Sequence, residues 1–368
     1  MHWYGSRCLA SLLILRGETK NSFAFYNGAA LSQLSNRIQQ QGKTFKDVDY
    51  LRHEKSTTTL EAEEDGYSIR DSFNLIVLGD LHMEDDMKTH EESRQDCVRA
   101  LERLSLLPCL EEFKRDDAAS TVDGTEVTVG MLIEKLQKER AGDLSARQLE
   151  ILLAHKRDGT YLKSHLVSLG DLGRKDIRHE PGDAGTTKSF EDAKAFFDGF
   201  GIPYNLVTGN HDLEGLDEFE TDSDNLHAWM KTFGLDQPQF CKKIGHRTLL
   251  IGLSTVRFRD APFSSHEVHV DDEQLKWFVD TVKSHPAEDG WKICVFSHAP
   301  IMGSGLRVLQ NVHVVNGCAW LNHCSPESRK LFIQTVKAHP QIKLWFSGHF
   351  HLSHDYQVRI QTFELLVD

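Results

Sequence analysis

The sequence contains no apolar run long enough to span a lipid bilayer. The longest apolar stretch near its start, Cys8 to Leu15, is far shorter than the ~20 residues that a membrane-spanning helix needs. We therefore expect a protein without a membrane span. A hydrophobic fraction of 39% still allows a sizeable core, and a charged fraction of 26% is ordinary for globular domains.

Positive charge is scarce. The sequence has 42 Lys and Arg residues against 55 Asp and Glu residues, which gives a formal net charge of -13 at pH 7. Such a charge repels nucleic-acid backbones and anionic lipid surfaces, and no Lys/Arg stripe with interleaved aromatic residues offsets it. The composition argues against a nucleic-acid partner. A small anionic substrate would need a bound metal ion to reverse the local field.

Paired cysteines are also missing. The seven cysteines are odd in number and contain no C-x-x-C pair, which favours a reducing compartment. The stretch from Cys318 to Cys324 includes His323, and it fits either a small zinc loop or ordinary loop residues.

Acidic residues are nearly absent from residues 1–46, where Glu18 is the single acid. The basic residues of this segment are Arg7, Arg16, Lys20, Arg37, Lys43 and Lys46. The composition resembles an organelle presequence, with an uncleaved tail as the alternative, so the expected location is the cytoplasm or an organelle. Residues 42–70 are polar and are interpreted as a linker. We expect residues 1–70 to precede one domain over residues 71–368.

Short apolar runs alternate with helical patterns in this domain, which favours a layered α/β fold. The runs predict strands at Asn74 to Leu78, Leu166 to Leu169, Tyr204 to Val207, Thr248 to Leu253, Ile293 to Phe296 and Leu344 to Phe346. Helical spacing predicts helices at Phe190 to Phe200 and Asp272 to Val282. The stretch Tyr356 to Val367 predicts two short strands, and we expect the last strands of the sheet to be incomplete there.

Residues 85–164 are expected to form a long insertion between the first two strands. Helical spacing occurs at residues 98–113, 129–138 and 146–155, with a polar, turn-like break at residues 118–124. The insertion is either a helical cap near the site or a bystander bundle. Substrate specificity is expected to lie in it and in the loop at residues 301–326.

Residues of metal-binding types follow five of the predicted strands. They are Asp80, His82, Asp171, Asn210, His298, His349 and His351. Ligands of open α/β sheets gather at the carboxyl ends of strands, so we expect these side chains to converge. Carboxylate and amide oxygens mixed with imidazoles suit first-row divalent metals, and seven such groups are too many for one ion. The sequence predicts a two-metal centre.

The order of the motifs, D-x-H, G-D, G-N-H-D, H and G-H-x-H, resembles the calcineurin-like metallophosphoesterase superfamily over roughly residues 74–355. The resemblance implies a four-layer α/β sandwich of two mixed β-sheets flanked by helices, and two divalent metal ions (Mn, Fe or Zn). Carried over position by position, it implies one metal on Asp80, His82 and His351, a bridging Asp171, and a second metal on Asn210, His298 and His349.

A centre of this kind is expected to hydrolyse phosphate mono- or diesters of small phosphorylated substrates, by in-line attack of a hydroxide that bridges the metals. His211 has no assigned metal and is expected to act as general acid, with Asp212 available to orient and charge it. Arg174, three residues after Asp171, is a candidate for binding a substrate phosphate.

Three differences from the motifs of related enzymes narrow the expected activity. No tyrosine lies three residues after Asp171, which argues against a purple acid phosphatase. Met83 stands where Ser/Thr protein phosphatases carry glycine, and Asp212 replaces their glutamate, which argues against a specialised phosphoprotein phosphatase. A non-catalytic scaffold and a nuclease of the same fold remain as alternatives.

Overall fold

The structure is a computed structural model of the chain. It describes residues 13–18, 22–27, 73–83, 90–95, 97–98, 101, 121–122, 125–126, 163–174, 182–245, 247–302 and 320–350. The chain divides into two compact units. The first comprises Met1–Leu13, Leu75–Gln95 and His165–Asp368, and the second comprises Ile14–Asn74 and Asp96–Ser164.

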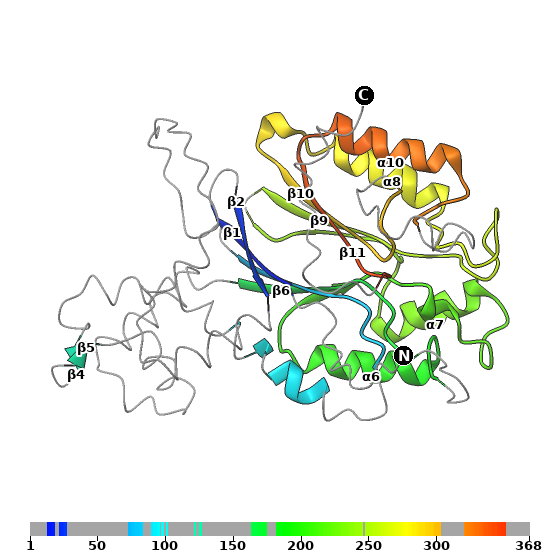
Figure 1. Cartoon of the computed structure of the whole chain (residues 1–368), viewed down its shortest axis with the longest axis horizontal. Coiled ribbons are helices and arrows are strands. Elements are labelled where there is room, and N and C mark those ends of the chain that lie inside the picture. Colours follow the sequence, from blue (N-terminus) through cyan, green and yellow to red (C-terminus); the bar gives the residue numbers. More distant parts are fainter. Residues whose placement is uncertain are drawn as a thin grey trace, which may run out of the picture. The chain divides into compact units, whose positions relative to one another are not determined.

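Two sheets form the framework of the first unit (Figure 1). In one, β3 (Phe73–Leu78), β6 (Lys163–Ser168) and β7 (Tyr204–Leu206) are neighbours in that order. The other has the order β11-β10-β9-β8, with β8 at Phe240–Lys243, β9 at Thr248–Leu253, β10 at Lys292–Ser297 and β11 at Ile342–Ser347. Strands β9, β10 and β11 run parallel and β8 is antiparallel to β9, so this sheet is mixed.

Helices cover the outer faces of the two sheets, as Figure 1 shows. They are α6 (Thr187–Asp198), α7 (Asp222–Phe233), α8 (Asp272–Lys283) and α10 (Pro326–Ala338). Each begins at a residue whose side-chain oxygen accepts a hydrogen bond from a backbone N–H of the first turn, as N-caps do. These capping residues are Thr186, Thr221, Asp271 and Ser325. Two short 3-10 helices occur at His211–Leu213 (η5) and Ala287–Asp289 (η6).

The core of the four-stranded sheet is apolar and aromatic. All six residues of β9 are buried, and α8 and α10 bring Phe278 and Phe332 against it. The ring of Trp345 lies 5.8 Å from Phe278 and 5.9 Å from Phe332, in edge-on geometry. Such aromatic pairs add to the free energy gained by burial. This core fixes the carboxyl ends of β9, β10 and β11.

The second unit contains adjacent strands β1 (Leu13–Glu18) and β2 (Ser22–Asn27), which lie within the segment interpreted as presequence-like. An antiparallel pair, β4 (Thr121–Val122) and β5 (Thr125–Glu126), lies in the predicted insertion, at its turn-like break. The predicted helices at residues 129–138 and 146–155, and most of residues 98–113, lie outside the described residues.

The predicted two-sheet α/β arrangement with helices outside is confirmed, and the six strands predicted before residue 350 and both helices predicted outside the insertion are present. Helices α7 and α10 and strand β8 were not predicted. The stretch Tyr356 to Val367 lies outside the described residues. Among the helices that the structure describes, none combines the length and apolar character needed to cross a membrane.

Candidate metal centre

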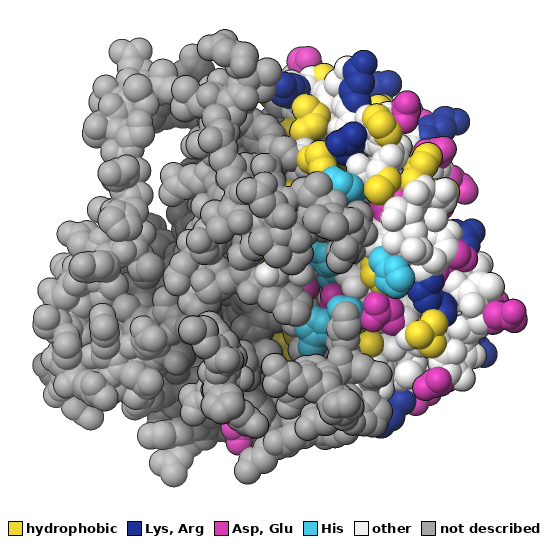
Figure 2. Space-filling model, turned by 45° about the vertical axis from the view of Figure 1, so that its right-hand side comes forward, with side chains coloured by type: hydrophobic (Ala, Val, Ile, Leu, Met, Phe, Trp, Pro, Cys, Tyr) yellow, Lys and Arg dark blue, Asp and Glu magenta, His cyan; other side chains and the backbone are white. Residues whose placement is uncertain are grey.

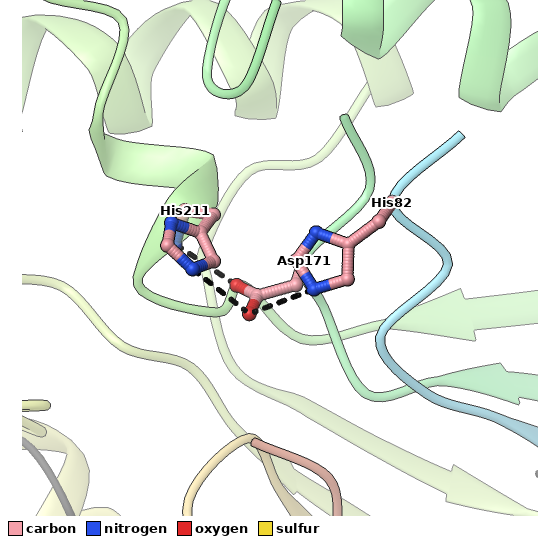
Figure 3. A group of neighbouring side chains, drawn as sticks. All are labelled: His82, Asp171 and His211. Carbon is pink, nitrogen blue, oxygen red and sulfur yellow. Dashed lines mark hydrogen bonds and ion pairs between the residues drawn. The ribbon is translucent and has the colours of Figure 1, made fainter. Parts of the chain in front are cut away.

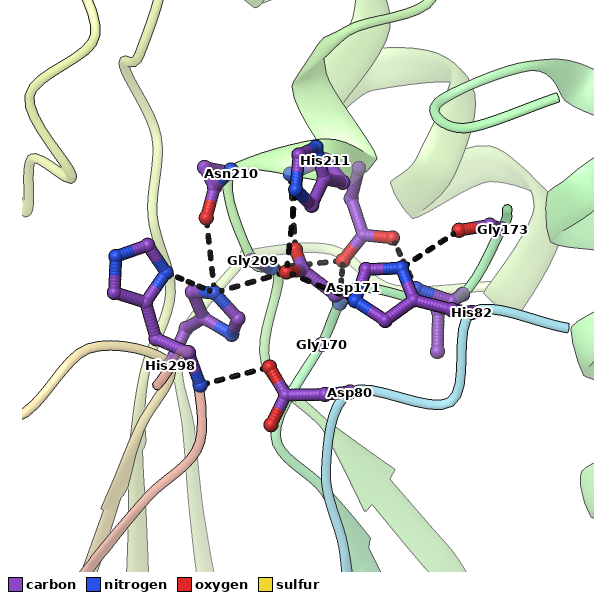
Figure 4. A network of polar contacts seen from close by, with 12 residues as sticks. Asp80, His82, Gly170, Asp171, Gly173, Gly209, Asn210, His211 and His298 are labelled. Atoms are coloured by element: carbon purple, nitrogen blue, oxygen red, sulfur yellow. Dashed lines mark hydrogen bonds and ion pairs between the residues drawn. The ribbon is translucent and has the colours of Figure 1, made fainter. Parts of the chain in front are cut away.

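The predicted ligands meet where five strands end (Figure 4). Asp80 and His82 follow β3, Asp171 follows β6, Asn210 follows β7, His298 follows β10 and His349 follows β11. On the face drawn in Figure 2, histidine side chains gather with acidic side chains beside them. Of the predicted ligands, His351 lies outside the described residues. The predicted convergence is found for the six others.

Asp171 occupies the middle of the group, with only 1% of its surface exposed. Its Oδ2 atom lies 3.2 Å from His298 Nε2, 3.8 Å from His82 Nε2 and 4.0 Å from His211 Nε2. Figure 3 shows the rings of His82 and His211 on either side of this carboxylate. One carboxylate therefore faces three imidazoles, and each comes from the segment that follows a different strand.

His298 links Asp171 to a second set of side chains. Its Nε2 atom lies 3.0 Å from Asn210 Oδ1 and 3.1 Å from His349 Nδ1. Its Nδ1 atom lies 2.8 Å from the carbonyl oxygen of Leu169, the type of backbone contact that fixes the tautomer of a metal-binding histidine. With Nδ1 donating there, Nε2 is directed at the site.

Two sets of side chains could each hold a metal ion, and they share Asp171. One is His82, Asp171 and His211, and the other is Asp171, His298 and His349; within each set the ligand atoms all lie within 4.8 Å of one another. Carboxylate and imidazole donors are the set that Mn, Fe and Zn accept. The residues present therefore fit two divalent ions, with Asp171 placed to contact both.

The charges of Asp171 and His298 stabilise each other. Burial alone would raise the pKa of Asp171, but the charges of His298 and His211 hold that pKa well below its usual range. Burial alone would lower the pKa of His298, but the charge of Asp171 and the hydrogen bond to it raise that pKa to about 9. The carboxylate is thus kept in the ionised form that binds metal.

The backbone is forced into rare conformations where the ligands attach. Asp80, His82, Asp171 and His349 have positive φ angles of 51°, 39°, 55° and 71°. Non-glycine residues adopt such angles at a cost, and they cluster at functional sites. A hydrogen bond of 2.7 Å from His349 N–H to Asp80 Oδ1 joins two of these positions.

Two glycines of the motifs leave room for carboxylates. A Cβ atom on Gly209 would lie 2.1 Å from Asp171 Oδ1, and one on Gly348 would lie 2.3 Å from Asp80 Oδ2. Both distances are far below van der Waals contact. Glycine at these positions of G-N-H-D and G-H-x-H is therefore required by close packing against a ligand.

Asp212 is fully buried and organises the backbone of the site. Its Oδ2 atom accepts from the N–H groups of Asp171 at 2.9 Å and Gly209 at 2.8 Å, and its Oδ1 accepts from Leu172 at 2.9 Å. Burial, reinforced by the charge of Asp171, raises the pKa of Asp212 to about 6. Asp212 thus joins the loops after β6 and β7.

The carboxylate in contact with the His211 ring is that of Glu214, whereas Asp212, predicted to orient this ring, contacts backbone N–H groups. Glu214 directly follows η5, three residues after His211, and its Oε2 atom lies 2.5 Å from His211 Nδ1. The sequence prediction chose the adjacent residue, but in a helical turn side chains three apart share a face. The spacing His-x-x-Glu in the sequence could have indicated this contact.

Arg174 lies just past the ligand Asp171. Its N–H group donates a hydrogen bond of 2.9 Å to Asp183 Oδ1, and its carbonyl oxygen accepts from the N–H groups of Asp183 and Ala184. These contacts fix its backbone. The role of its side chain in binding a substrate phosphate stays a prediction.

A comparison with family profiles identifies the family to which this arrangement belongs. The profile of the calcineurin-like phosphoesterase family matches residues 73–353. An uncharacterised protein, YvnB of Bacillus subtilis (strain 168), is 27% identical over 186 residues, which are 48% of this chain and 12% of the relative. The chain thus covers only a small part of that relative's length.

Among solved structures, a dimetal phosphatase from Danio rerio is similar with a TM-score of 0.35 and 14% sequence identity, covering 54% of this chain and 69% of that one. The family match takes in every described side chain of the site and more than half of the chain. This chain belongs to the calcineurin-like phosphoesterase family.

Proposed function

We propose that the chain is a metal-dependent hydrolase of phosphate mono- or diesters. The observation that carries the proposal is the shared carboxylate of Asp171, which belongs to both sets of ligand atoms. A carboxylate common to two sets is the arrangement that two-metal phosphoryl-transfer sites use. Family membership supports the same class of reaction.

Seven candidate ligands of the chain would hold the two ions. The first would be held by Asp80, His82 and His351 and the second by Asn210, His298 and His349, with Asp171 common to both. Divalent Mn, Fe or Zn bound there would activate the attacking water and neutralise charge on the phosphoryl oxygens. The neutral amide of Asn210 limits the negative charge of the ligand set, so the site attracts an anion.

His211 is proposed as the general acid. Its Nδ1 atom is held by Glu214 Oε2, so Nε2 faces the site at 4.0 Å from Asp171 Oδ2. A protonated imidazole in that position donates its Nε2 proton to the oxygen of the departing alcohol. Glu214 stabilises the protonated ring and fixes its orientation, while Asp212 holds the two loops that carry Asp171 and His211.

The proposal is tested by removing metal with a chelator and restoring Mn, Fe or Zn one at a time. Each reconstituted sample is assayed on 4-nitrophenyl phosphate and on bis(4-nitrophenyl) phosphate. Turnover of either ester that disappears with chelation and returns with metal supports the proposal, and the faster ester identifies the class. Protein that binds two metals per chain and hydrolyses neither ester contradicts it and favours a scaffold.

A further inference from the structure

One of the six predicted strands carries no candidate ligand at its end. Strand β9 is followed by Ser254 and Thr255, whereas the other five are followed by candidate metal ligands. Strand β9 is nevertheless aligned with the site, because Leu253 pairs in parallel with Ser297, the residue before the ligand His298. The end of β9 therefore lies at the sheet edge where the ligands gather, and its polar residues need an explanation other than metal binding.

Ser254 and Thr255 bind the segment that leads to the ligand Asn210. The N–H group of Thr208, two residues before Asn210, donates a hydrogen bond of 3.2 Å to Ser254 Oγ. Thr255 N–H donates to the carbonyl oxygen of Thr208 at 3.2 Å, and the Thr208 hydroxyl donates to the carbonyl oxygen of Thr255 at 2.5 Å. All three residues are fully buried. These hydrogen bonds join the G-N-H-D segment, which follows β7 of one sheet, to the end of β9 in the other.

Gln274 of α8 fixes the backbone of Ser254. Its Oε1 atom accepts from Ser254 N–H at 3.1 Å, and its Nε2 atom donates to the carbonyl oxygen of Ser254 at 3.1 Å. The Ser254 hydroxyl donates in turn to the carbonyl oxygen of Pro238 at 2.6 Å. Gln274 is buried and occupies the third position of α8, after the N-cap Asp271. Glutamine at this position of a helix often reaches back to the N-cap, but here its side chain holds Ser254 instead.

The second candidate metal site is assembled from both sheets. Asn210 follows β7 of one sheet, whereas His298 and His349 follow β10 and β11 of the other. Asn210 Oδ1 lies 3.0 Å from His298 Nε2, a contact that Figure 4 shows. Distances from a metal ion to its ligands are fixed to within ~0.2 Å, so a small shift between the sheets would carry one of the ligands out of range. The second site therefore depends on how the two sheets are joined.

The contacts of Ser254 differ from the other contacts around this site. Asp212 joins the segment of Asn210 to the loop after β6, which belongs to the same sheet. The ligands His298 and His349 do contact groups of the first sheet, but these contacts place the ligands of the second sheet. The hydrogen bonds of Ser254 act on the segment of Asn210 itself, and they do so without occupying a ligand position.

We propose that Ser254 and Gln274 are positioning residues of the second metal site, which hold Asn210 opposite His298. Ser254 acts through the backbone of the segment that leads to Asn210, and Gln274 acts through the backbone of Ser254. The inference rests on the proposed two-metal function and names residues outside the ligand set that keep the second site assembled. Removal of hydrogen-bonding groups behind metal ligands typically costs about 10- to 100-fold in metal affinity or activity.

The decisive variant is Ser254→Ala, which removes a single buried oxygen. Metal-free protein is titrated with Mn²⁺ by calorimetry, and electron paramagnetic resonance spectra are recorded along the titration. In the wild-type protein, two ions that share Asp171 should be spin-coupled. In the variant, the affinity for one ion should fall about 10- to 100-fold while the affinity for the other is unchanged. A Mn²⁺ concentration that just loads the wild-type protein should then give a single uncoupled ion, and excess Mn²⁺ should restore the coupled pair.

A second variant, Gln274→Met, keeps the length of the side chain but neither of its hydrogen-bonding groups. It should weaken the same ion, because the backbone of Ser254 is no longer fixed. Ser328→Ala is the matched control, since Ser328 is a buried serine of α10 whose hydroxyl lies 2.9 Å from that of Ser325. Its melting temperature should fall by an amount similar to that of Ser254→Ala, but both ions should keep their affinities.

A selective loss of one ion in Ser254→Ala and Gln274→Met, absent from Ser328→Ala, supports the inference. Unchanged affinities in Ser254→Ala, an equal weakening of both ions, or the same loss in Ser328→Ala would each show that Ser254 only stabilises the fold, and would overturn it. Melting temperatures of all three variants show that each is folded under the conditions of the titration.

Turnover separates this inference from the proposed function. Wild-type protein that binds a coupled pair of ions and hydrolyses neither 4-nitrophenyl ester contradicts the proposed function alone, and a selective loss of one ion in Ser254→Ala still supports the positioning role. Wild-type protein that hydrolyses an ester with Mn²⁺, together with a Ser254→Ala variant that binds both ions as tightly, contradicts the positioning role alone.

Discussion

The metal centre and the pair formed by Glu267 and His269 are both buried and polar, but their polar atoms have different surroundings. In the metal centre, both oxygens of Asp171 and both ring nitrogens of His298 have contacts within the protein. In this pair, Glu267 Oε2 and His269 Nδ1 lie 4.0 Å apart and have no hydrogen-bond partner. The first region is preorganised by the protein itself, as catalytic groups must be.

The largest effect is expected from Asp171→Asn, which removes charge from both sets of ligands at once. Turnover of the preferred 4-nitrophenyl ester should fall about 10³-fold or more, because two ions lose a common anionic ligand. Steady-state assays at saturating metal measure this. Glu191→Gln on α6, an exposed position, is the control. Retention of more than a tenth of the activity would contradict the placing of Asp171 at the centre.

His211→Ala should lower kcat about 10²- to 10⁴-fold, as loss of a general acid does. The loss should be smaller for 4-nitrophenyl esters than for alkyl esters, since nitrophenolate leaves without protonation. Kinetics on the two kinds of ester check this, and metal analysis should still give two ions per chain. Equal losses on both kinds of ester would rule out the acid role and favour His211 as a ligand.

Glu214→Gln is expected to disturb the orientation of the His211 ring, whereas Asp212→Asn is expected to weaken the loops that Asp212 holds together. Because Glu214 contacts the ring of His211, its variant should lose about 10- to 100-fold in kcat with little change in melting temperature. Because Asp212 accepts three buried backbone N–H groups, its variant should lose roughly 1–3 kcal/mol of stability. Thermal unfolding and kinetics of both variants measure the contrast, and the reverse pattern would restore Asp212 to the orienting role.

The smallest effect is expected from Glu267→Gln on the stability of the ligand-free protein. Burial raises the pKa of Glu267 above its ordinary value, so the folded state disfavours the charged form. This penalty is fully present above the folded-state pKa and vanishes below about 4.5, the ordinary value. The variant should therefore melt at a higher temperature than the wild-type protein near pH 7, and the difference should shrink as the pH falls toward 4.5. A variant less stable than wild type at neutral pH would show that Glu267 is structural.

The strands and the convergence of the candidate metal ligands could be predicted because each leaves a local signal. A run such as Thr248–Leu253, buried throughout, is continuous in sequence, and the ligands follow such runs directly. Strand β8 lacked that signal, since only Phe240 of its four residues is buried. Helix α10 did carry one, Ser325 as cap and Pro326 at its first turn, which sequence analysis assigned to a loop.

The contacts of Glu214 and Glu267 could not be predicted in the same way. The contact between Glu214 and His211 depends on a 3-10 turn whose presence no apolar pattern indicates. Glu267 meets Cys324 across 57 positions of sequence, through loops that have no periodicity. Such pairs are set by tertiary packing, which no local pattern in the sequence indicates.

Metal content of the purified protein tests the central claim most directly, namely that Asp171 is common to two metal sites. Elemental analysis of the wild-type chain reconstituted with Mn, Fe or Zn should give two ions per chain, and Asp171→Asn should bind fewer than one at the same free metal concentration, because both sets of ligands are weakened together. A variant that keeps two ions, or one that loses a single ion and holds the other with unchanged affinity, would contradict the account.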